Sequence, residues 1–165
     1  MKEKLQEFAL VAEIISALAV VAGLIFVGLE IRQSTEQAEL NTRAIETAAY
    51  QELIAQVLQI STTVAADEAL FDVFLRNQEG EVFTEQADIA RFDLYTITVA
   101  RHADMACFQF QQGTLSEERL VSAMAIFMNV VMRSENGRRG LTNVMNSSPG
   151  LAECIDQVSP YFERE

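Results

Sequence analysis

The longest apolar stretch of the chain lies near its N-terminus. Ile14–Leu29 contains no charged residue, and Leu10–Ile31 is interrupted only by Glu13 and Glu30. As a helix rising about 1.5 Å per residue, the longer segment reaches about 33 Å, enough for a hydrocarbon core of about 30 Å. Because a carboxylate at the centre of a bilayer is costly, the two Glu residues have to lie at opposite rims. The pattern predicts a transmembrane helix within a first region, residues 1–32.

Two alternatives to a membrane anchor are a cleaved signal peptide and the core helix of a soluble protein. No small-x-small cleavage site directly follows the apolar run, and no polar face interrupts residues 14–29 at helical spacing. An uncleaved anchor is therefore favoured. Lys2 and Lys4, the only lysines, precede the span, and an acidic remainder follows it. The positive-inside rule then predicts a single pass through a bacterial inner membrane, with a cytoplasmic N-terminus and the bulk of the chain in the periplasm.

The second region, residues 33–165, has the periodicity and the end signals of helices. Residues 33–60 contain no Gly or Pro and are rich in good helix formers, so the membrane helix is expected to continue outward. Three later helices are expected to begin at side chains that cap helices, and Gly residues follow the first two; the caps are Asp67, Thr84 and Ser116, and the terminating glycines are Gly80 and Gly113. No segment alternates apolar and polar residues convincingly. The predicted fold is all-α: an N-terminal transmembrane helix continuing into an antiparallel helical bundle.

Several stretches resemble a widespread group of single-pass bacterial membrane proteins to which no activity is assigned. The stretches are ALAVVAGLIFVGLEIRQST (residues 17–35), AAYQ (residues 48–51) and FTEQADIARFDLYTITVARHADMACFQFQQGTLSEERL (residues 83–120). The group usually has a Trp-containing helix near the C-terminus, and this chain has no Trp. The resemblance implies the membrane topology and supplies no catalytic residue.

Composition narrows the function classes. The net charge of −12 makes nucleic acid an unfavourable partner, because binding phosphates needs clustered Lys and Arg. Two Cys and one His are too few for a disulfide-rich scaffold or a four-ligand zinc site. The sequence also lacks a phosphate loop, a dinucleotide-binding fingerprint and a nucleophile elbow. We therefore expect no cofactor, no metal and no enzymatic activity.

Small residues follow one face of the apolar helix. The face consists of Ala12, Ser16, Ala19 and Gly23, spaced by threes and fours, and it ends at Glu30. Small residues let two membrane helices approach closely, so this stripe is a candidate helix-association face. The alternative is the ordinary Ala and Gly content of a helix that faces lipid. Glu30 itself is expected to be hydrated at the membrane rim or paired with Arg32.

Four polar residues share one face of the predicted helix over residues 85–112. They are Arg91, Tyr95, Thr98 and His102, and they would line a ligand pocket if a second helix faced them. A structural or surface role is the alternative for His102, since the chain has no second His and no metal-binding or triad motif. In an exported domain Cys107 and Cys154 would form a disulfide, and two buried thiols are the alternative.

These features support two hypotheses about function. The first is a non-enzymatic single-pass membrane protein that acts as a structural or accessory subunit of a membrane assembly. Its contacts would be membrane lipid and either a second copy of itself or another membrane protein. The second is an exported, ligand-sensing helical bundle anchored to the membrane.

Overall fold

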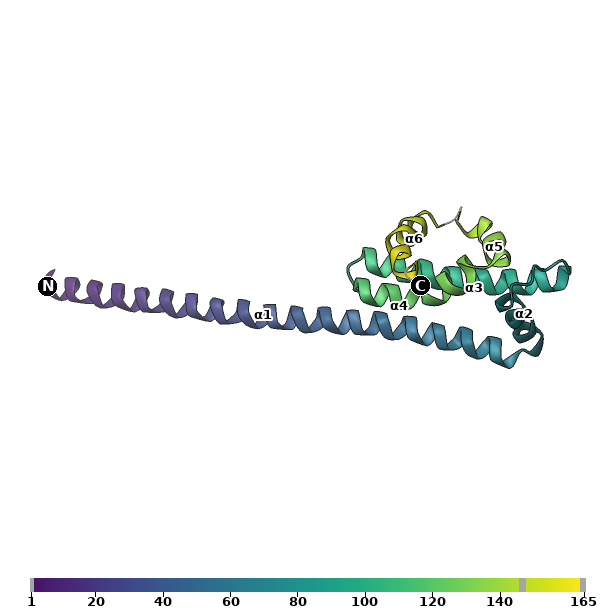
Figure 1. Ribbon diagram of the computed structural model, residues 1–165. Coiled ribbons are helices and arrows are strands. Elements are labelled where there is room, and N and C mark those ends of the chain that lie inside the picture. The colour runs from purple at the N-terminus through teal and green to yellow at the C-terminus, as the bar shows by residue number, and fades with distance from the viewer. Residues whose placement is uncertain (1, 146–147, 164–165) are drawn as a thin grey trace. The chain divides into compact units, whose positions relative to one another are not determined.

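The computed structural model describes residues 2–145 and 148–163, and they form an all-α protein (Figure 1). The elements in chain order are α1 (Lys2–Ala66), α2 (Glu68–Gln78), α3 (Gln86–Gln111), α4 (Glu117–Ile126), the π-helix η1 (Phe127–Met132), α5 (Glu135–Met145) and α6 (Pro149–Phe162). No strand occurs among these residues. The predicted fold class is therefore confirmed.

The chain forms two compact units, residues 1–44 and 45–165. The first consists of α1 alone, and the second contains the end of α1 and all later helices. The predicted continuation of the apolar helix beyond its apolar segment is confirmed, because α1 is one uninterrupted helix (Figure 1). Within it, the apolar side chains from Ile14 to Ile31 whose exposure is described are all exposed. This helix is long and apolar enough to cross a membrane, and none of its apolar window is buried within the structure.

The predicted helix ends are largely confirmed. Asp67 accepts a hydrogen bond from the Leu70 amide at 3.0 Å, and Ser116 caps α4 in the same way. Gly80 and Gly113 follow their helices with φ angles of 86° and 73°, a conformation that glycine adopts at no steric cost.

The prediction that Thr84 caps α3 is wrong, because the N-cap is Glu85. The reason lies in the preceding loop. The Phe83 amide donates to Asn136 at 3.0 Å and its carbonyl accepts from Arg139 at 3.3 Å. These tertiary contacts keep the chain extended up to Glu85, so the helix begins one residue later than the local sequence indicates.

The helical segment that begins after Ser116 divides into α4 and η1. Its interior is buried. The fully buried side chains there include Leu120, Met124, Phe127 and Val131. The change to π-helical geometry has no counterpart in the sequence pattern.

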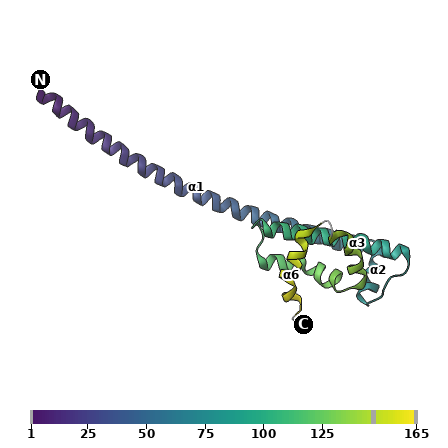
Figure 2. The ribbon, with the colours of Figure 1, turned by 90° about the horizontal axis from the view of Figure 1, so that it is seen from above.

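Helix α3 is the centre of the domain formed by residues 45–165. It contacts α2, α4, η1, α5 and α6, most extensively α5. Figures 1 and 2 show α2 and α6 toward opposite ends of α3. The contact with α5 is close at Gly140, where a Cβ atom would lie 3.0 Å from Asp93 Oδ1 and 3.1 Å from Thr96 Cγ2. Residues of α3 such as Phe92, Val99 and Ala103 are completely buried as a result.

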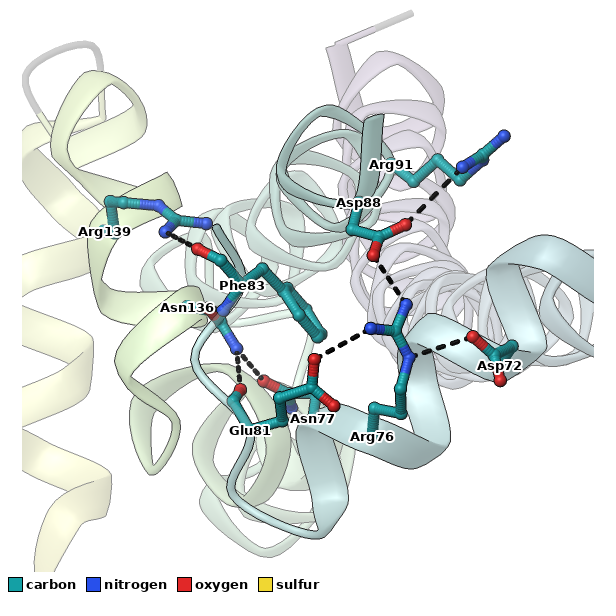
Figure 3. Close-up of polar contacts among 9 residues, drawn as sticks. All are labelled: Asp72, Arg76, Asn77, Glu81, Phe83, Asp88, Arg91, Asn136 and Arg139. Atoms are coloured by element: carbon teal, nitrogen blue, oxygen red, sulfur yellow. Dashed lines mark hydrogen bonds and ion pairs between the residues drawn. The ribbon is translucent and has the colours of Figure 1, made fainter. Parts of the chain in front are cut away.

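One buried side chain joins α5 to the loop between α2 and α3 (Figure 3). The Asn136 amide nitrogen donates to Asn77 Oδ1 at 3.1 Å and to the Glu81 carbonyl at 2.7 Å. Its oxygen accepts from the Phe83 amide. Since Asn136 is 1 % exposed, removing its side chain takes from these groups the partners that the folded domain provides.

A second polar cluster holds the same loop from its exposed side. The guanidinium of Arg76 lies 2.9 Å from Asp72, 2.8 Å from Glu81 and 2.6 Å from Asp88 (Figure 3). It also lies over the ring of Phe83, 5.3 Å from the centroid. Three carboxylates and one aromatic ring therefore share a single cation.

Replacing Asn136 by Ala is expected to lower the free energy of unfolding by about 2–3 kcal/mol, because it leaves buried backbone and amide groups without partners. Urea unfolding of the full chain in detergent, followed by circular dichroism, measures the change. The exposed Asn129 is the control, and Asn129→Ala should change the value by less than about 0.5 kcal/mol. Equal effects of the two substitutions would contradict the role given to Asn136.

Candidate functional site

A half-open groove of about 700 Å³ lies in the domain formed by residues 45–165. Its walls come from the last part of α1, the start of α2 and the exposed side of α3. The lining residues are Gln56, Gln59, Ile60, Thr63, Val64, Asp67, Leu70, Arg91, Leu94, Tyr95, Ile97, Thr98, Arg101, His102 and Met105. The four residues singled out on one helix face, Arg91, Tyr95, Thr98 and His102, all line this groove.

The lining of the groove is mainly apolar. Ile60 and Val64 of α1 and Leu70 of α2 contribute to one side. On α3, Leu94 is 67 % exposed and Met105 is 44 % exposed. The groove therefore presents apolar side chains that the folded domain does not cover.

His102 connects the two walls of the groove. Its Nδ1 lies 3.2 Å from Oε1 of Gln56, which is on α1. The amide nitrogen of Gln56 donates to Glu52 at 3.2 Å, so the amide oxygen faces the imidazole. In this orientation the amide oxygen of Gln56 accepts a hydrogen bond whenever the ring carries a proton on Nδ1. Gln56 was not recognised from the sequence, because nothing local relates it to a residue 46 positions away.

Burial lowers the pKa of His102, and the smaller effect of the Ala123 backbone raises it. The side chain is 4 % exposed, and its Nε2 is buried without a hydrogen bond of ordinary geometry. The imidazole is therefore neutral at pH 7. A buried, neutral imidazole fits the structural role considered for His102 from the sequence.

The hydroxyl groups of Tyr95 and Thr98 differ in whether they already have a hydrogen-bond partner. Desolvation raises the pKa of Tyr95 to about 12, and its ring packs 5.8 Å from Phe74 and 5.5 Å from Phe92, between centroids. Its hydroxyl stays protonated at pH 7, and the described residues provide it with no hydrogen-bond partner. The Thr98 hydroxyl donates to the Leu94 carbonyl at 2.9 Å, so it has no further hydrogen to donate to a ligand.

The charged groups of the groove are two arginines and one aspartate. Arg101 donates to Ser148 at 2.8 Å and lies 3.5 Å from Asp104. Arg91 lies 3.6 Å from Asp88, a carboxylate that Arg76 approaches more closely, at 2.6 Å. The lining is thus locally cationic in a chain whose net charge is −12.

Cys107 of α3 and Cys154 of α6 are paired as a disulfide in the structure, with a Cα–Cα distance of 5.9 Å. Both residues are buried, with exposed fractions of 1 % and 2 %. The bond joins α6 to the central helix across 47 positions of sequence. Of the two alternatives stated from the sequence, a disulfide and two buried thiols, the structure contains the disulfide, and the proximity of the two residues follows from the packing of α6 on α3.

The candidate association face lies on α1, where Ala12, Ser16, Ala19, Gly23 and Glu30 are exposed. The Ser16 hydroxyl donates to the Ala12 carbonyl at 2.8 Å, so its proton is not available to a second helix.

Arg32 lies 3.4 Å from Glu36 rather than against Glu30. Of the two alternatives expected for Glu30, pairing with Arg32 is thus replaced by an i, i+4 pair, and hydration at the membrane rim stays a prediction. Residues two positions apart point to different sides of a helix.

The part of the chain that the structure describes contains no group of three or more His, Cys, Asp or Glu residues able to hold a metal ion. Comparison of the chain with family models, with curated proteins and with solved structures found no match. The resemblance to single-pass bacterial membrane proteins therefore stays a prediction.

Acidification is expected to destabilise the domain through His102. The unfolded side chain titrates near pH 6.5 and the folded one at lower pH, so between these values only the unfolded chain takes up the proton. The free energy of unfolding should be constant above pH 6.5 and fall as the pH falls below it. Urea unfolding of the full chain in detergent between pH 7.5 and pH 5.5 measures this decrease.

The matched variant is His102→Gln, which removes the only histidine. Its free energy of unfolding should be lower than that of the wild type at pH 7.5 and should vary less over the same range. Parallel pH profiles for the two proteins would show that another group causes the decrease.

Proposed function

We propose that this chain is a non-enzymatic, single-pass membrane protein that acts as a structural or accessory subunit of a membrane assembly. The observation that carries the proposal is the apolar segment of α1, whose described side chains are exposed throughout Ile14–Ile31. Large apolar side chains such as Leu24 and Phe26, 68 % and 67 % exposed, favour lipid over water. A bilayer covers such a surface along its whole circumference.

The same proposal includes orientation and location. Lys2 and Lys4 precede the span, and the acidic domain follows it, which favours a cytoplasmic N-terminus in a bacterial inner membrane. The disulfide between Cys107 and Cys154 supports this placement of the domain, because disulfides persist in the oxidising periplasm.

Association through α1 is the third part of the proposal. Gly23 has no atom within 4 Å of the position where a Cβ would stand, so this face is open to a second helix. In lipid, close packing of small residues drives helix association, because the hydrophobic effect does not operate between two helices there. The partner would be a second copy of the chain or another membrane protein.

A second candidate function, an exported ligand-sensing bundle anchored to the membrane, is favoured by the groove along α3. The groove brings together polar groups and an apolar lining at the size of a small-molecule site.

Alkaline carbonate washing tests the anchor. The intact chain should stay with the membrane pellet, and mass spectrometry of the pelleted protein should find the residues that precede the span, because an anchor is retained and a signal peptide is removed. A deletion of residues 2–32 is the control and should appear in the supernatant. Release of the full-length chain by carbonate would contradict the proposed membrane anchor.

Substitution of Gly23 by Leu tests association. Energy transfer between donor- and acceptor-labelled chains in lipid vesicles should show dimers, and Gly23→Leu should weaken them by about tenfold, or about 1.4 kcal/mol. Gly28→Leu is the matched control, since Gly28 lies about 140° around the helix from Gly23 and is equally open. If the two substitutions weaken the dimer equally, the predicted face is not the one that associates.

A further inference from the structure

We infer that the groove between α1 and α3 binds an anionic amphiphile, specifically a long-chain carboxylate with its acid group at Arg91 and its chain directed toward Met105. The inference rests on the second candidate function, a ligand-sensing domain, and it names the class of ligand. Three features of the groove support it: its length, the distribution of its charges and the polar group next to Arg91.

The groove is long and apolar along one helix. From Arg91 to Met105 the axis of α3 extends about 21 Å, at 1.5 Å per residue. Leu94, Ile97 and Met105 follow this line with 67 %, 39 % and 44 % of their surfaces exposed. On the opposite wall, α1 contributes more apolar side chains. A flexible hydrocarbon chain matches a narrow apolar strip of this length and would cover side chains that now face water.

The available cation lies at one end of the strip. Arg91 is exposed, and its described ionic partner is Asp88 at 3.6 Å, which is the distance of a weak pair. Arg101 is engaged by Ser148 and Asp104. The carboxylate of the lining, Asp67, points one oxygen at the Leu70 amide to cap α2. Arg91 is therefore the arginine of the groove with hydrogen-bonding capacity left for an incoming anion.

Tyr95 lies one helical turn after Arg91 on the same face of α3. Its hydroxyl has no partner among the described residues, and it can donate to a carboxylate that Arg91 holds. Both donors thus stand at the end where the acid group would lie. The other end of the strip is formed by Met105 and by Arg101, whose guanidinium already faces Ser148 and Asp104. This polarity distinguishes a carboxylate with one hydrocarbon tail from a wholly apolar ligand.

Photo-crosslinking of the full chain in phosphatidylcholine vesicles tests the inference. The probe is palmitate carrying a diazirine in its chain, and the labelled residues are identified by mass spectrometry of peptides. Labels are expected within residues 56–64 and 91–105. The hexadecanol analogue with the same diazirine is the neutral control, and it should label the groove about tenfold less.

Three variants test whether labelling of the groove depends on Arg91 and Leu94. Arg91→Gln should reduce groove labelling by palmitate about tenfold, to the level of the alcohol, and Leu94→Glu should abolish it. Both positions are exposed, so the fold is retained, which circular dichroism verifies. Arg133→Gln, outside the groove, is the matched control and should label like the wild type.

Labels within residues 12–31 report lipid contact of the apolar helix and thereby separate the two proposals. Labels there but not in the groove overturn the ligand inference and leave the membrane anchor intact. Groove labels without labels in residues 12–31 support the ligand and contradict the anchor. Equal groove labelling by acid and alcohol, or an unlabelled groove that forms crosslinks between two copies of the chain, also overturns the inference.

Discussion

The domain depends on the burial of one central helix. Helix α3 packs closely against α2, α4, η1, α5 and α6, and at Phe92, Val99 and Ala103 it is completely covered. Burial of this kind requires close approach, which Gly140 of α5 permits because a larger residue would meet Asp93 and Thr96. The disulfide holds α6 on the same helix. One side of α3 is covered only in part, and that side forms the groove.

The groove lies where α1 and α3 face each other, and Gln56 of α1 reaches His102 of α3 across it. Toward the earlier part of the domain, Tyr50 of α1 contacts α4 instead, lying under the guanidinium of Arg119 with 5.0 Å from centroid to Cζ. An apolar strip on α3, including Leu94, stays accessible within a domain whose other helices are tightly packed.

Periodicity and helix-end signals predicted most of the fold. The caps at Asp67 and Ser116 are local, since their side chains bond amides three residues ahead, and such signals are readable in sequence. Thr84 failed as a cap because Asn136 and Arg139, more than fifty positions away, hold Phe83. For the candidate site, helical spacing placed four side chains on one face of α3. Helical spacing could not predict that α1 forms the opposite wall of the groove, because no local pattern relates α1 to α3.

The sequence by itself determined the features that depend on residues close together along the chain. The all-α class, the length of the exposed apolar segment and the common face of Arg91, Tyr95, Thr98 and His102 follow from helical geometry and side-chain polarity. Only the tertiary structure decided that Gln56 is the partner of His102, that the cysteines are adjacent and that the face of α3 borders a groove. Those features depend on which helices meet and at what separation, and packing of the whole domain sets both.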